Sequence, residues 1–162
     1  MYHLSEAYLM ATYICLLAGY LGALVFSAAT VAPLAARVLP EAAAALLMRR
    51  FWERHHLFAS LGGAAFALAW GVASTISAVP IIYSSLLVAL AAGMTLSFFM
   101  ALQLIPSINE ARDRGNEARF KRLHRTDIIL IALGVAFGIA MLIALIYVLP
   151  GQFTFWPTEV GR

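Results

Sequence analysis

Charged residues are scarce in this sequence. Aspartate, glutamate, lysine and arginine make up 12% of its 162 residues, whereas hydrophobic residues make up 63%. Soluble domains carry roughly 25% charged residues. The mean hydropathy is +0.88, and a single core of this size cannot hide that much apolar surface from water. The composition therefore excludes a soluble globular domain and predicts a protein embedded in lipid.

Cysteine and early basic residues are nearly absent as well. Cys15 is the only cysteine, which excludes an intramolecular disulfide and a CxxC metal motif. No lysine or arginine precedes Arg37, so the chain lacks the positively charged start of a cleavable signal peptide. We therefore expect the first apolar run to be retained as a membrane span.

Four long runs contain no charged residue and no histidine. They cover residues 7–32, 57–79, 81–105 and 128–149. Each exceeds the roughly 20 residues that a helix needs to cross the hydrocarbon core, and an isolated apolar run in lipid satisfies its backbone only as a helix. The sequence predicts an all-α integral membrane four-helix bundle with up-down-up-down topology, in a single domain of residues 1–162.

Prolines mark the expected ends of these spans. Pro33 and Pro40 follow the first, Pro80 separates the second from the third, Pro106 closes the third and Pro150 closes the fourth. Because proline interrupts helical hydrogen bonding, we expect the helices to end at these positions.

Glycines indicate where helices approach one another. Gly19 and Gly22 lie in the first span, Gly62 and Gly63 in the second, and Gly134 and Gly138 form a GxxxG pair in the fourth. Small residues allow close helix packing in membranes, so we expect all three spans to pack through them.

Basic residues predict the orientation of the chain. Ten of the eleven lysines and arginines lie in the segments between spans one and two and between spans three and four. The positive-inside rule places both segments in the cytoplasm and both termini outside, in a bacterial-type inner membrane. We expect the segments to be cytoplasmic helical extensions of the spans, the second of them broken at Gly115–Asn116. Their basic residues should meet anionic lipid headgroups and not nucleic acid, because they do not follow one face.

The lack of ionisable residues within the four runs bears on function. A proton-coupled transporter needs such groups inside the membrane, so their absence counts against a transporter of that class. We therefore expect a non-catalytic accessory or partner-binding subunit, with a membrane protein or a second copy of the chain as its partner. An oligomeric channel or facilitator, lined by serines and threonines of the second and third spans, is an alternative.

Histidines and carboxylates are concentrated beside the second and fourth runs. Glu53-x-x-His56 and His124-x-x-Asp127 each place two side chains on one helical face. Glu-x-x-His pairs supply part of the ligand set in di-metal bundles, and imidazole with carboxylate suits Fe, Mn, Zn or Cu. Glu53, His56, His124 and Asp127 therefore form a candidate metal site of a membrane oxidoreductase, with haem ligation as a further possibility.

A layer of charge at the membrane surface is the competing interpretation. On this interpretation, Glu53 and Asp127 lie at the edge of the bundle, in the first turns of their helices, where the helix dipole favours acids. The remaining charges are arginines that would bind lipid headgroups: Arg49, Arg50, Arg54, Arg122 and Arg125.

Three stretches also carry a family resemblance. They are "GALVFSAATVAPLAARVLP" (22–40), "RRFWERHH" (49–56) and "LIPSINEARDRGNEARFKRLHR" (104–125). Together they resemble the transmembrane protein 205-like family, a four-span domain of unknown function, in which an F-x-x-L-H element precedes the last span. Here that element is Phe120, Leu123 and His124. Pro33 and Asn109 give a weaker similarity to anthrone oxygenase-like four-span proteins.

Overall fold

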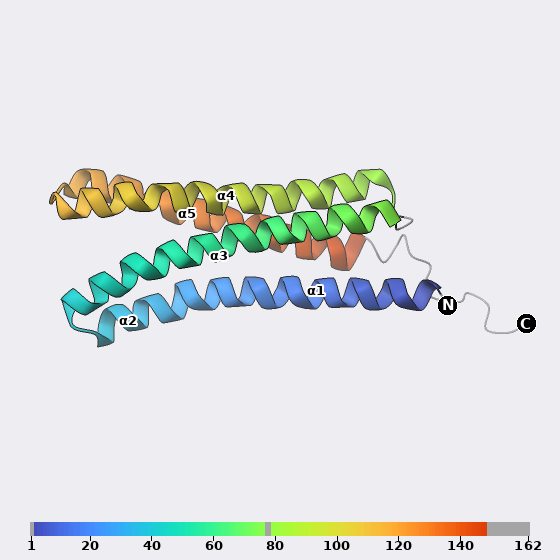
Figure 1. Ribbon diagram of the computed structural model, residues 1–162, viewed down its shortest axis with the longest axis horizontal. Helices are drawn as coiled ribbons and strands as arrows, with labels where there is room; N and C mark the ends of the chain where they lie inside the picture. Colours follow the sequence, from blue (N-terminus) through green and yellow to red (C-terminus); the bar gives the residue numbers. More distant parts are fainter. Residues whose placement is uncertain (1, 77–78, 149–162) are drawn as a thin grey trace, which may run out of the picture.

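The computed structural model describes residues 2–76 and 79–148, and in these ranges the chain is helical, without strands. Four helices in the described part are long and apolar enough to cross a membrane (Figure 1). The first consists of α1 (Tyr2–Phe26), the π-helical turn η1 (Ser27–Val31) and α2 (Ala32–Val38). The others are α3 (Glu41–Ile76), α4 (Ile81–Asp113), and α5 (Glu117–Ile143) with its π-helical end η2 (Ala144–Val148). The predicted all-α membrane bundle is confirmed.

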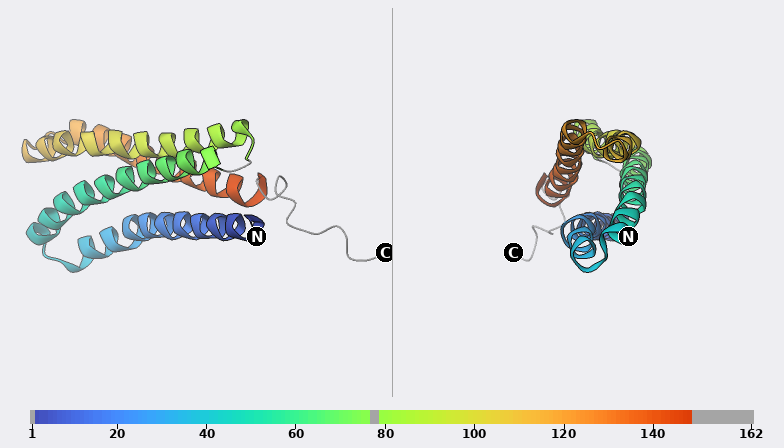
Figure 2. Two further views of the ribbon diagram at one scale, coloured as in Figure 1. Left: turned by 45° about the vertical axis from the view of Figure 1, so that its right-hand side comes forward. Right: turned by 90° about the vertical axis from the view of Figure 1, so that its left-hand side faces the viewer.

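The helices follow one another around the bundle in the order α1, α3, α4, α5 (Figure 2). Helices α3, α4 and α5 pack along much of their length, whereas α1 makes far fewer contacts with its neighbours. Leu17, Met94, Phe98, Met141 and Leu145 are fully buried between them. Most other large apolar side chains point outward, as expected where lipid is the solvent.

Two helices continue past the prolines that were expected to end them. Pro106 lies inside α4, which runs on to Asp113. The first span passes Pro33, which lies in the first turn of α2, where a missing backbone N–H is tolerated. The expectation that these two prolines end helices is therefore wrong, because a proline in a membrane helix is tolerated where neighbours and local π-helical turns satisfy the freed backbone groups.

The other prolines behave as expected. Helix α3 begins directly after Pro40 and α4 directly after Pro80, while Pro150 lies outside the described residues. Because α3 begins at Glu41, the segment before the second apolar run is an extension of that span, as predicted.

The turn between α4 and α5 forms at the predicted break. Gly115 has a φ of 63°, a backbone conformation that glycine adopts without strain. The N–H of Asn116 donates to the Ala111 carbonyl at 2.9 Å, which caps α4 in the manner of a Schellman motif. The Asn116 side chain then accepts from the backbone N–H of Arg119 at 3.0 Å and caps α5.

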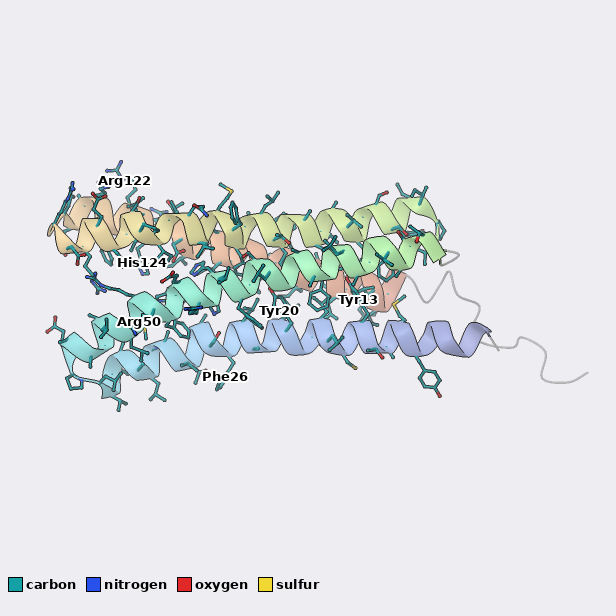
Figure 3. All side chains as sticks on the ribbon, in the orientation of Figure 1. Tyr13, Tyr20, Phe26, Arg50, Arg122 and His124 are labelled. Carbon is teal, nitrogen blue, oxygen red and sulfur yellow. The ribbon has the colours of Figure 1, made fainter. Side chains whose placement is uncertain are left out.

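Two tyrosines hold α1 against α3. The Tyr13 hydroxyl donates to the Phe66 carbonyl at 2.8 Å, and the Tyr20 hydroxyl donates to the Ala59 carbonyl. Both rings lie in the layer between the two helices (Figure 3). Each of these carbonyls also accepts a backbone hydrogen bond within α3, so it accepts two hydrogen bonds. Tyr13 and Tyr20 are two turns apart, which places both on one face of α1.

Glycines permit close approach at some of the predicted positions and not at others. A Cβ added at Gly63 would lie 2.6 Å from Thr95 Oγ1 and 3.2 Å from Thr95 Cα. Gly134 faces the Phe98 ring just as tightly. In contrast, a Cβ at Gly19 or Gly22 would meet nothing within 4 Å. The expectation that the first span packs through its glycines is therefore wrong, because α1 is anchored by tyrosines instead.

The contrast between these glycines gives a test of the packing. Gly63→Ala should lower the free energy of unfolding by roughly 1–3 kcal/mol, because the added methyl meets the backbone of α4, which cannot yield locally. Gly19→Ala should cause no loss, since its surroundings are open. Thermal unfolding of both variants in the same detergent measures the difference. Equal effects at the two positions would contradict the close contact between α3 and α4.

Candidate functional site

A histidine of α3 meets an aspartate of α5 inside the bundle. His56 Nε2 lies 3.0 Å from Asp127 Oδ1. The two residues are 0% and 3% exposed. Helix α3 begins at Glu41 and α5 at Glu117, so neither Glu53 nor Asp127 lies in a first turn. The expectation that these groups occupy helix starts at the edge of the bundle is therefore wrong, because both helices begin well before the apolar runs.

Hydrogen bonding determines how many protons this pair holds. His56 Nδ1 contacts the Trp52 carbonyl, which can only accept, so Nδ1 carries a hydrogen. The contact between Nε2 and Asp127 needs one further proton, on the nitrogen or on the oxygen. The pair is thus either imidazolium with carboxylate or imidazole with carboxylic acid. It is neutral in both forms, which is what burial favours.

The neighbouring histidine, His55, faces the first span and not α5. The Ser27 hydroxyl donates to the Leu24 carbonyl at 2.9 Å, so its oxygen accepts from His55 Nδ1–H at 3.0 Å. His55 is 6% exposed, and its Nε2 is buried without a hydrogen-bond partner among the described residues. Ser27 opens the π-helical turn η1, an element that often occurs at functional sites.

A cavity of about 170 Å³ opens beside the His56–Asp127 pair. It lies between α3, α4 and α5 and is lined by Met48, Arg49, Trp52, Ile105, Ile108, Asn109, Arg112, Phe120, His124 and Asp127. Asp127 thus contributes both to the buried pair and to the cavity wall. The cavity combines apolar walls, an amide group, cationic groups and the carboxyl group of Asp127.

Two arginines line this cavity, and only one of them is in an ion pair with a described residue. Arg49 Nη1 donates to Asp113 Oδ2 at 3.0 Å, and its second nitrogen contacts the other oxygen, so this charge is already neutralised. Arg112 lies 5.3 Å from the centre of the Phe120 ring and is in no ion pair within the ranges described. Arg112 therefore supplies the unopposed positive charge of the cavity.

The structure brings together two of the four predicted metal ligands. His56 and Asp127 are paired, whereas Glu53 is exposed on α3 and His124 stacks on Phe120 with ring centres 5.6 Å apart. No group of three or more His, Cys, Asp or Glu side chains that could hold a metal ion occurs among residues 2–76 and 79–148.

Sequence reasoning did not assign Ser27, Trp52 or Arg112 to the site. The Trp52 carbonyl could have been found, since a histidine can bond to the carbonyl one turn earlier. Nothing local in the sequence pairs Ser27 with His55, because they are 28 residues apart on different helices.

Residues 15–117 match a family described as Domain of unknown function (DUF4149). The match covers well over half of the chain, including His56 and the cavity residues Asn109 and Arg112, and it ends before Asp127. No curated protein and no solved structure matches the chain.

The coupling between His56 and Asp127 can be measured with a double-mutant cycle. His56→Leu and Asp127→Leu should each lower the free energy of unfolding by roughly 3–5 kcal/mol, because either change leaves a polar partner buried and unpaired. The double variant should be no less stable than either single variant. Chemical or thermal unfolding in detergent provides the four values.

Lys121→Leu is the matched control for that cycle, since Lys121 is exposed and lies outside the cavity, and it should change stability by no more than about 0.5 kcal/mol. If the losses from His56→Leu and Asp127→Leu simply add, the two side chains do not interact.

Proposed function

The chain belongs to the DUF4149 family, and we propose that it binds a small acidic molecule in the cavity between α3, α4 and α5 and exchanges a proton with it. The observation that carries this proposal is the position of Asp127, which lines the cavity while it is bonded to His56. A buried group of this kind is costly in a membrane protein and marks a functional site by default. The chain is a multi-pass membrane protein by its four spans.

The size and charge of the cavity define the class of ligand. Its volume of about 170 Å³ is close to the roughly 150 Å³ that accommodates one benzene molecule in an apolar protein cavity. Since the His56–Asp127 pair is neutral, the unopposed charge of Arg112 favours an anionic group. Asn109 adds amide hydrogen-bonding capacity beside it. A one-ring carboxylate or phenol fits these features.

Each residue has a distinct role in this proposal. Arg112 and Asn109 hold the anionic end of the ligand, and the apolar wall, including Ile105 and Trp52, holds its ring. Asp127 exchanges a proton with the ligand, and His56 replaces or receives that proton, since it shares one with Asp127 already. Such exchange between adjacent groups within hydrogen-bond reach is the basis of general acid–base chemistry.

The buried groups also change the argument for a non-catalytic role. That expectation depended on the lack of ionisable side chains within the four apolar runs, and His55, His56 and Asp127 are buried in the bundle directly beside the starts of two of these runs. An accessory role with a membrane partner or a second copy, and an oligomeric channel, stay predictions from the sequence.

The proposal also covers the relatives of the chain and its orientation in the membrane. We propose, from the three stretches that carry the resemblance, that the chain is related to the transmembrane protein 205-like proteins. The position of Asn109 in the cavity wall supports the weaker similarity to anthrone oxygenase-like proteins. We further propose a bacterial inner membrane, with the cavity end of the bundle in the cytoplasm and both termini outside, because the basic residues gather at that end.

Metal binding is the second candidate function. His56 Nδ1 bonds to a backbone carbonyl, the arrangement that orients metal-ligating histidines. On this proposal His56 and Asp127, with Glu53 and His124 moving toward them, hold Fe, Mn, Zn or Cu. Elemental analysis separates the two functions: about one ion per chain, lost in His56→Ala, supports metal binding, and an equal metal content in both proteins contradicts it.

Binding of 4-hydroxybenzoate tests the first proposal. Arg112→Ala should weaken its binding by about tenfold or more, because a charge-assisted hydrogen bond contributes roughly 1.5–3 kcal/mol. Asp127→Asn should weaken 4-hydroxybenzoate but leave benzoate unchanged, since only the former carries a hydroxyl for Asp127. Ligand-observed NMR on protein in phosphatidylcholine nanodiscs gives the affinities.

Arg122→Ala is the matched control, because it removes an exposed arginine that lies outside the cavity. An affinity for 4-hydroxybenzoate that Arg112→Ala and Arg122→Ala lower equally would contradict the proposed site, and so would the absence of any binding to the unmodified chain.

A further inference from the structure

A second hollow lies on the other side of α3, along its seam with the first span. This groove has a volume of about 500 Å³. It is lined by Ala23, Leu24, Ser27, Leu47, Arg50, Phe51, Arg54, His55 and Phe58. None of these residues lines the cavity beside Asp127, so the groove is a separate feature.

Two arginines of α3 line the groove. Arg50 and Arg54 are one turn apart and therefore lie on the same face of α3. Both are exposed, and neither is in an ion pair with any described residue. Arg49, by contrast, is bonded to Asp113. Figure 3 shows Arg50 between α3 and the end of the first span. The pair thus offers two free guanidinium groups to an anion.

Apart from the two arginines, Ser27 and His55, the residues that line the groove are apolar. Among them, Phe58 is 54% exposed. From Leu57 onward α3 enters the uncharged run that crosses the membrane. From Arg50 to Phe58 the polarity of the groove therefore falls along α3, since the two arginines precede the uncharged run and Phe58 lies within it.

We propose that this groove binds one anionic phospholipid from the bilayer. Arg50 and Arg54 bind the phosphate, since guanidinium matches phosphate oxygens in pairs. One acyl chain lies along Leu24 and Phe58. The charge complementarity and the polarity gradient both fit this occupant, which is amphipathic in the same direction.

His55 gives the groove a second polar contact. Its Nδ1 is committed to Ser27, and its Nε2 is buried and has no hydrogen-bond partner among the described residues. This nitrogen is therefore available as an acceptor for a hydroxyl of the bound lipid, and phosphatidylglycerol is an anionic phospholipid that carries such hydroxyls.

Native mass spectrometry of protein released from nanodiscs of phosphatidylcholine and phosphatidylglycerol tests this proposal. The unmodified chain should retain one phosphatidylglycerol in preference to phosphatidylcholine. The double variant Arg50→Gln/Arg54→Gln should retain it about tenfold less, because each basic residue near anionic lipid adds to the attraction. Ala23→Phe, which fills the groove without changing charge, should lower retention as well.

Arg122→Gln/Arg125→Gln is the matched control, since it removes two exposed arginines from α5 outside the groove. Retention should be unchanged in it. Equal losses in both double variants would mean a diffuse surface attraction and would overturn the proposal, as would equal retention of the two lipids by the unmodified chain. Binding of 4-hydroxybenzoate should be the same in all these variants, so failure here leaves the cavity proposal standing.

Discussion

Burial of polar groups in a lipid-soluble bundle is the constraint on which this structure depends. Lipid offers no hydrogen bonds, so a carboxyl group such as that of Asp127 is buried at low cost only where a partner such as His56 holds the pair at zero net charge. His56 and Asp127 meet this condition with one shared proton and one carbonyl partner, Trp52. The pair also joins α3 to α5, two helices that are separated by α4 around the bundle (Figure 2). The two side chains that join these helices are thus the same two in which we propose proton exchange with a ligand.

Helix α3 carries two adjacent histidines with different neighbours. Neighbouring residues of a helix point about 100° apart, so His55 reaches Ser27 of the first span while His56 reaches Asp127 of α5. The groove lies on the first side and the cavity on the second. Among the described residues, the cavity has one arginine outside any ion pair, Arg112, and the groove has two, Arg50 and Arg54. The same helix can therefore serve a lipid on one face and a small acid on the other without a residue in common.

The sequence was sufficient for the spans and for some of their ends. Hydropathy predicts four helices because length and lack of charge decide which segments cross lipid. The break at Gly115–Asn116 was predictable from glycine and asparagine chemistry. The position of the site inside the bundle was not predictable. The polar segments before the apolar runs remain helical, and α4 continues through Pro106. The motif Glu53-x-x-His56 does not identify the carboxylate that His56 contacts. That carboxylate belongs to Asp127, 71 residues away on another helix, and no local pattern specifies such a contact.

Hydrogen exchange at the histidine rings tests most directly the claim that His56 and Asp127 form a buried pair sharing a proton. Protein with ¹⁵N-labelled histidine, in bilayers transferred to D₂O, can be followed by NMR at each ring nitrogen. The account predicts that the ring hydrogens of His56 persist long after those of the exposed His124 have exchanged, and that Asp127→Leu removes this protection. Exchange of His56 as fast as that of His124 in the unmodified chain would contradict the account.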